Sequence, residues 1–179
     1  MKTPLVLLLF FLVLGAGGCD RTPAPRVGDV PGASPAASSA ARPQFSYINT
    51  GDVRAKPQLL SGWYPIEDGA WRWMGKEAQA VLLTPQESPF SFELRLFFPE
   101  NHMKRVGGPV TVSVLLDGTL FAQETFSRPG NQAIHKSVPA GTLGGPSTKL
   151  TIRVDRTIPP TDTDKRELGA VIQGFGFLK

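Results

Sequence analysis

The sequence predicts an all-β fold, an antiparallel β-sandwich of the jelly-roll kind, from three observations. Apolar and polar residues alternate with a period of two in several short segments, as in strands that bury one face. Turn residues separate these segments, and the 179 residues include 17 prolines and 19 glycines, more than a helix-rich fold carries. No window of a dozen residues has the apolar stripe of an amphipathic helix. Short strands joined by turns favour a sandwich.

The alternation is clearest at residues 90–98, where five apolar side chains face one way and the polar ones face the other. Asp117-Gly118 predicts a hairpin turn, because both residues tolerate a positive φ. Three glycines in 168–178 indicate a bulge or a closely approaching neighbour. In chain order, the predicted strands are residues 78–83, 90–98, 110–116, 119–126, 133–138, 150–154 and 168–178.

The N-terminus has the layout of a secretory signal, so residues 1–18 are set apart from the fold. Lys2 gives a positive start, residues 5–14 form an unbroken apolar run, and small residues follow. The apolar run is shorter than the ~20 residues that a membrane-spanning helix needs. Cys19, the only cysteine, comes next, so a disulfide within the chain is excluded.

Residues 14–19, Leu-Gly-Ala-Gly-Gly-Cys, resemble a bacterial lipobox, in which small residues lead into a cysteine that becomes the mature N-terminus. The resemblance implies that Cys19 receives a thioether diacylglycerol and often an N-acyl chain, and two or more chains hold a protein stably in a membrane. Ala16 departs from the pattern, which more often has leucine there. The alternative is a chance cysteine beside an ordinary cleavage site. Asp20 is typical of enteric lipoproteins retained at the periplasmic face of the inner membrane.

A tether is expected to join the lipidated cysteine to one folded domain. Residues 19–44 are rich in Pro, Ala, Ser and Gly and contain no aromatic residue, so they cannot bury enough surface to fold. The composition changes at Phe45, and residues 45–179 are long enough to form a single domain with its own core.

The charge pattern argues against nucleic-acid binding. The net charge is +4, but the Lys and Arg residues are spread over the chain instead of forming one basic run. His102 and His135 stand alone, without a partner at a metal-ligand spacing, and both are expected in surface loops or strands. We therefore expect no metal and no cofactor.

Two clusters stand out from the alternating pattern. All three tryptophans lie in the segment 63–73, where Trp71 and Trp73 are expected on one side of a strand and Arg72 on the other. A second cluster, 162–169, contains five charged residues and leads into the last strand. The candidate contact residues from the two clusters are Trp63, Tyr64, Glu67, Trp71, Arg72, Trp73, Asp164, Arg166 and Glu167.

These motifs, Gly-Trp-Tyr-Pro-x-Glu with Trp-Arg-Trp and a late Asp-x-Arg-Glu-Leu-Gly, resemble a β-sandwich module of bacterial envelope polysaccharide systems. That module occurs alone or attached to glycosyltransferase-type membrane proteins, and it is similar to the broad galactose-binding, jelly-roll class of carbohydrate-associated domains. The resemblance implies that the two clusters act together. It implies no catalytic residues.

Three interpretations of the clusters remain open. The tryptophans are core residues, with Arg72–Glu167 or Arg166–Glu67 as a structural ion pair; or the clusters contact a glycan; or they contact a membrane-protein partner. Catalysis is the least favoured function, because neither histidine stands in a nucleophile motif and the acidic residues follow turns. The sequence thus predicts a lipid-anchored envelope protein whose sandwich binds or assembles and does not catalyse.

Overall fold

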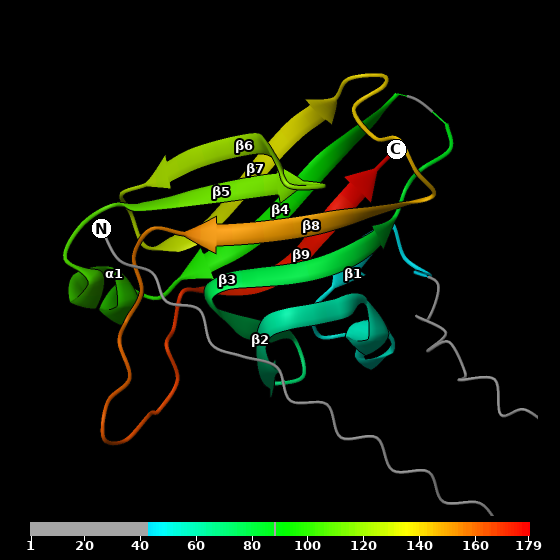
Figure 1. Cartoon of the computed structure of the whole chain (residues 1–179). Helices are drawn as coiled ribbons and strands as arrows, with labels where there is room; N and C mark the ends of the chain where they lie inside the picture. The colour runs from blue at the N-terminus through cyan, green and yellow to red at the C-terminus, as the bar shows by residue number, and fades with distance from the viewer. Residues whose placement is uncertain (1–42, 88) are drawn as a thin grey trace, which may run out of the picture. The chain divides into compact units, whose positions relative to one another are not determined.

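The computed structural model describes residues 43–87 and 89–179, which form a domain of antiparallel strands (Figure 1). The predicted signal 1–18, the lipidation of Cys19 and nearly all of the predicted tether 19–44 lie outside the described residues. Within them, no helix is long and apolar enough to span a membrane. The elements are β1 (Tyr47–Asn49), η1 (Val53–Gln58), β2 (Leu59–Glu67), β3 (Trp71–Leu83), β4 (Phe90–Phe98), α1 (Glu100–Val106), β5 (Val110–Leu116), β6 (Thr119–Phe126), β7 (Gly130–Val138), β8 (Ser147–Val154) and β9 (Ala170–Leu178).

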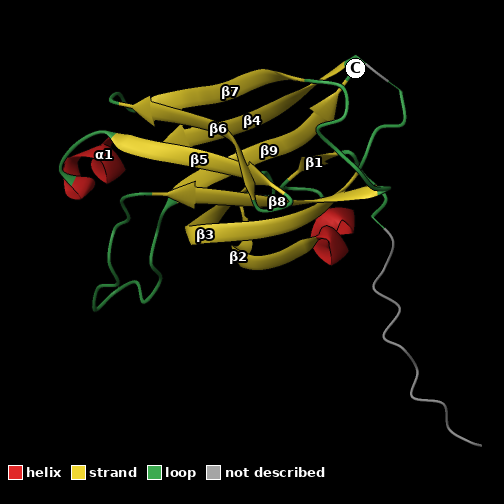
Figure 2. Cartoon of the chain, turned by 45° about the horizontal axis from the view of Figure 1, so that its top comes forward, coloured by secondary structure: helices red, strands yellow, loops and turns green. Residues whose placement is uncertain are grey.

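The strands follow one hydrogen-bonded path, β6-β5-β8-β3-β9-β4-β7, with β1 added to β9 and β2 added to β3. Strand β3 changes partner along its length. Its first part, Arg72–Met74, pairs with β9, and its last part, Glu77–Leu83, pairs with β8. The path therefore folds over at β3 and produces two facing layers. Figure 2 shows the strands turned by 45° about the horizontal axis from the view of Figure 1.

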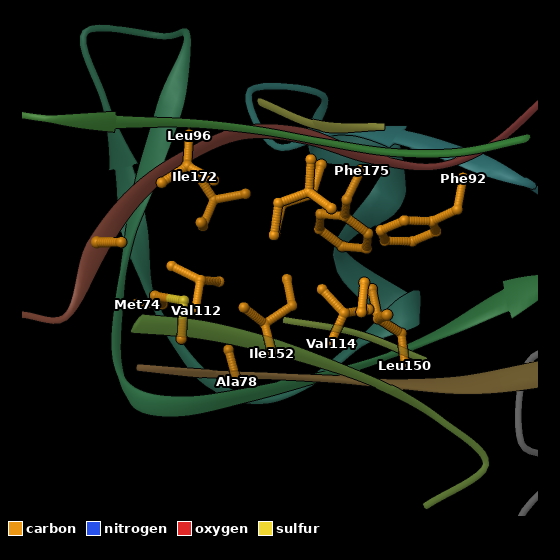
Figure 3. Packing of buried hydrophobic residues seen from close by; sticks show 14 of the residues in the cluster. Met74, Ala78, Phe92, Leu96, Val112, Val114, Leu150, Ile152, Ile172 and Phe175 are labelled. Carbon is orange, nitrogen blue, oxygen red and sulfur yellow. The ribbon is translucent and has the colours of Figure 1, made fainter. Parts of the chain in front are cut away.

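The core lies between these layers (Figure 3). Leu96, Ile172 and Phe175 project from the β9-β4 side toward Val112 and Ile152 on the β5-β8 side. Each of these five side chains is at most 1% exposed. Burial of two apolar faces against each other is what holds a sandwich together. The predicted all-β antiparallel sandwich is confirmed.

The strongest sequence patterns gave the right strands. Strands β4, β5 and β6 have the predicted bounds, and β3, β7 and β8 extend beyond the predicted segments at their N-terminal ends. The β5–β6 turn has positive φ at both Asp117 (48°) and Gly118 (84°), as the hairpin required.

The glycines of β9 allow β1 to approach closely. A Cβ atom on Gly176 would clash with the Ser46 carbonyl oxygen, and one on Gly174 would lie 3.1 Å from the Ile48 carbonyl oxygen. The pairing of β9 with β4 also shifts register after Arg95. The bulge and the close approach that the glycines indicated are both present.

Three features differ from the sequence expectation. Strands β1 and β2 were not predicted, since β1 has three residues and β2 is broken by register shifts against β3. His102 is not a surface residue: it lies in α1 and is 1% exposed, because its ring packs among aromatic side chains. His135 is exposed on β7, as expected.

Candidate functional site

The β2–β3 hairpin presents two tryptophans on the outer face of the sheet. Its turn has positive φ at Asp68 (49°) and Gly69 (67°), and it pairs Glu67 with Trp71. Burial then alternates along β3, so that Trp71 and Trp73 are half-buried while Arg72 between them is buried. The two indoles therefore share the face of β3 that points away from the core.

Trp71 and Trp73 line a pocket of about 400 Å³. Its floor comes from the neighbouring strands β9, β4 and β7, because β9 pairs with both β3 and β4. The side chains around it are mostly apolar, with a carboxylate and two amides among them. The lining residues are Glu67, Trp71, Trp73, Phe97, Pro99, Asn131, Val171 and Gln173.

The two pocket amides hold one another in place. The Nε2 of Gln173 donates a hydrogen bond of 3.2 Å to the Oδ1 of Asn131. Asn131 is opposite Phe97 in the β4–β7 ladder, so the amide pair lies beside an aromatic ring. An apolar surface with a few fixed polar groups is the common arrangement of a small-ligand site.

His102 supports Trp73 from beneath. The ring centroids of these residues lie 5.8 Å apart, and the His102 ring stacks on Phe98 at 5.4 Å. The Nε2 of His102 lies 3.3 Å from the Leu168 carbonyl oxygen, while its buried Nδ1 has no partner among the described residues. Burial lowers the pKa of His102, and the Arg105 charge lowers it further.

Arg166 connects the tryptophan cluster with the charged cluster that precedes the last strand. Its Nη1 donates to Glu67 Oε1 at 2.5 Å, and its Nη2 donates to Asp164 Oδ2 at 2.8 Å. Hydrogen bonds from Arg166 lower the pKa of Asp164 to about 2, and the two carboxylates raise the pKa of Arg166. Glu67 is thereby held at the edge of the pocket that it lines.

The alternative ion pair, Arg72 with Glu167, is not formed. Glu167 Oε1 accepts a hydrogen bond from the Thr157 hydroxyl at 2.7 Å. The Arg72 guanidinium instead donates to the carbonyl oxygens of Thr50 and Tyr64. Burial lowers the pKa of Arg72, and its role is to hold backbone groups of β2 and the β1–η1 turn.

Tyr64 fastens the late loop to β2. Its hydroxyl donates to the Glu167 carbonyl oxygen at 3.0 Å and accepts from the Glu167 N–H at 3.1 Å. The Arg166 guanidinium also lies over the Tyr64 ring, 5.4 Å from its centroid. The structure thus brings the two motifs into contact.

Trp63 is separate from the pocket. Its ring stacks on Phe175 at 5.2 Å, and its indole N–H donates to the Gln79 carbonyl oxygen at 2.7 Å. It packs partly buried against the core. Of the nine candidate contact residues, Glu67, Trp71 and Trp73 line the pocket, while Asp164, Arg166, Tyr64 and Glu167 support its Glu67 edge.

Sequence reasoning did not find Phe97, Asn131 and Gln173 as site residues. The sequence did contain an indication of Phe97: it is an apolar residue at an outward position of a strand whose other outward residues are polar. The two amides carried no such signal, because only the register of β4 with β7 and β9 brings them beside Phe97. No cluster of His, Cys, Asp and Glu side chains suited to a metal ion occurs in residues 43–87 and 89–179.

No protein-family model and no curated protein matches the chain. Among solved structures, a family 35 carbohydrate-binding module from Clostridium thermocellum is 7% identical, with 75% of this chain and 98% of that chain covered and a TM-score of 0.45. The carbohydrate-binding module CBM36, solved with calcium and xylotriose, is 10% identical over 75% of this chain and 100% of its own, with a TM-score of 0.41. A family GH115 4-O-methyl-α-glucuronidase is 13% identical over 74% of this chain, which spans only 17% of that protein, with a TM-score of 0.47.

Proposed function

We propose that the domain binds a glycan in the pocket lined by Trp71 and Trp73. One observation carries the proposal: two neighbouring indoles are half-buried on the outer face of the sheet, beside a carboxylate and two amides. A sugar ring presents apolar C–H faces that stack on flat aromatic side chains, and its hydroxyls pair with carboxylates and amides. The pocket offers both kinds of contact within about 400 Å³.

The same geometry supports binding without catalysis. Glycoside hydrolysis uses two carboxyl groups held ~5–10 Å apart across the scissile bond. Among the described residues that line the pocket, Glu67 is the only carboxylate, and Arg166 holds it in an ion pair. The carboxylate oxygens of Glu67 are suited to accept hydrogen bonds from sugar hydroxyls.

Titration of the purified domain with neutral and acidic oligosaccharides, followed by tryptophan fluorescence and calorimetry, tests the proposal. Trp71→Ala should abolish binding, and Gln173→Ala should weaken it about tenfold by removing one hydrogen-bonding group. Trp63→Phe is the matched control, because Trp63 lies outside the pocket. Unchanged binding by Trp71→Ala in a folded protein would exclude this site.

We also propose that lipid on Cys19 holds the domain at the periplasmic face of the bacterial inner membrane. The lipobox-like segment ending at Cys19 and the adjacent Asp20 support this placement. Palmitate should label the wild-type protein in a bacterial host, and Cys19→Ser should lose the label and leave the membrane fraction or remain unprocessed. Equal labelling of both proteins would contradict the assignment.

A membrane-protein partner that uses the same face is the alternative occupant. Crosslinking in membranes, followed by pull-down of wild type and Trp71→Ala, distinguishes the two functions. A partner captured by wild type alone, with no glycan bound in solution, would favour the partner.

A further inference from the structure

The tryptophan pocket continues into two neighbouring hollows. One, of about 510 Å³, is reached past Trp71 and is lined by Asn49 and Arg95 among others. The second, of about 360 Å³, lies over β4 and β7 and is lined by Arg95, Gln132 and Ala133 among others. Gln173 lines all three hollows, so they form one trough across the outer face of β1, β9, β4 and β7.

The strand register explains why these side chains form a row. Phe97 is opposite Asn131 and Arg95 is opposite Ala133, so both pairs point outward from β4 and β7. Gln173 lies at the register shift between β9 and β4, next to these pairs. Neighbouring strands are ~4.8 Å apart, so the row from β9 to β7 spans about 10 Å, more than one sugar ring needs.

The polar groups of the trough are mostly amides that retain unused hydrogen-bonding capacity. Asn49 Oδ1 accepts from Arg95, and Gln132 Nε2 donates to the Arg128 carbonyl oxygen. Among the described residues, the Nδ2 groups of Asn49 and Asn131 and the Oε1 groups of Gln132 and Gln173 have no hydrogen-bond partner. The hollows therefore offer both free donors and free acceptors, and sugar hydroxyls can pair with either kind.

The charged residues of the trough are paired. Arg95 Nε lies 3.6 Å from Glu93, and Glu93 also accepts a hydrogen bond from the Tyr47 hydroxyl. Asp52 is paired with Arg54 at 2.7 Å, and Glu67 is paired with Arg166. Each charged residue that lines the three hollows thus faces an opposite charge. With Asp164, which shares Arg166 with Glu67, these paired groups sum to one negative charge, so the trough does not favour an anionic ligand.

We propose that the trough binds a neutral polysaccharide chain, with the Trp71–Trp73 pocket as one of at least two adjoining sugar subsites. This inference rests on the proposed glycan binding and adds the length and the charge class of the ligand. Both neighbouring hollows share lining residues with the pocket, so a chain bound in the pocket has room to extend beyond it.

Chain length is the first test. Titration uses gluco-, xylo-, manno- and galacto-oligosaccharides of one to six units, with oligogalacturonate as the charged counterpart. Affinity for a neutral series that binds should rise by at least about tenfold, or 1.4 kcal/mol, between one unit and the longest chain. Equal affinity for all lengths, or tighter binding of oligogalacturonate, would overturn the inference and leave the pocket assignment intact.

Ala133→Trp is the second test, because it fills the hollow over β4 and β7 without touching the tryptophan pocket. It should reduce affinity for the longest chain at least about tenfold and leave single sugars unaffected. His135→Trp is the matched control, since His135 is exposed on the same face of β7 but lines none of the three hollows. Equal loss with the two variants would contradict the trough. If all three variants, Trp71→Ala included, still bound every sugar as wild type does, the proposed function itself would be refuted.

Discussion

Arg166 connects the tryptophan cluster of β2 and β3 with the charged cluster of the late loop. It contacts Glu67 on β2 and Asp164 in the late loop, and it covers the Tyr64 ring. The pairs are about one-third exposed, so solvent screens them and their contribution to stability is modest. The main consequence of the contacts is geometric, because they fix the carboxylate at the pocket edge.

Arg166→Met should lower the free energy of unfolding by about 1 kcal/mol. It should reduce the free energy of glycan binding by more than that, because Glu67 loses its position. Chemical denaturation and titration measure the two effects. Lys165→Met is the control, since the Lys165–Asp162 pair at 3.6 Å is exposed. Equal effects of Arg166→Met and Lys165→Met on glycan binding would refute this role of Arg166.

The Asp164–Arg166 pair should also make stability depend on pH. The pKa of Asp164 is lowered to about 2, so the contribution of this pair to stability is complete above pH ~4 and is lost as the pH falls toward 2.

His102 should make stability depend on pH in the mildly acidic range. Burial lowers the pKa of His102 in the folded protein, so the unfolded chain binds the proton first. The stabilising contribution is complete above the unfolded value of ~6.5 and is lost as the pH falls below it. Thermal unfolding from pH 8 to 5 measures the loss.

His102→Leu should flatten this dependence, because the buried titrating group is gone. The control His135→Gln should leave it unchanged, since that ring is exposed on β7. Melting temperatures of wild type and His102→Leu that fall in parallel would mean that another group is responsible.

At the scale of elements, β9 depends on a glycine where β1 crosses close to it. A Cβ atom on Gly176 would clash with the Ser46 carbonyl oxygen and would lie 2.6 Å from the Tyr47 Cα. Gly176→Ala should therefore displace β1 and cost about 1–3 kcal/mol, as overpacking does. Gly144→Ala is the control, because a Cβ there meets nothing within 4 Å. Denaturant midpoints compare the two, and equal midpoints would show that β1 yields without strain.

The sequence predicted strands wherever alternation was long and uninterrupted. Strand β4 alternates from Phe90 to Leu96, and its bounds were right. Strand β2 was missed because its register shifts three times against β3 and Gly62 has φ of 78°, so its burial does not alternate. Local pattern records which face is buried, and a bulged edge strand has no constant face.

The candidate site was predictable only where its residues are neighbours in sequence. Trp71 and Trp73 were found because their spacing on a strand places them together. The pairing of Arg166 with Glu67 was one of two alternatives, since charge alone does not select a partner. Asn131 and Gln173 could not be predicted from the sequence, because their proximity arises from strand register between distant segments.

At the scale of the molecule, the two layers should unfold together. Strand β3 is hydrogen-bonded to β9 in one part and to β8 in the other, so neither layer can separate without breaking its pairing. Tryptophan fluorescence reports on β2 and β3, and far-ultraviolet circular dichroism reports on all strands. The two should give coincident denaturant transitions. Two separate midpoints would contradict a single cooperative unit.

The shared strand also has a mechanical consequence. A polymer pulled across the outer face would load Trp71 and Trp73, and β3 carries both. Its backbone would pass that load into β8 through seven antiparallel residue pairs, from Glu77 to Leu83. Tension on a captured chain would thus be distributed over both halves of the domain instead of peeling away the strand that grips it.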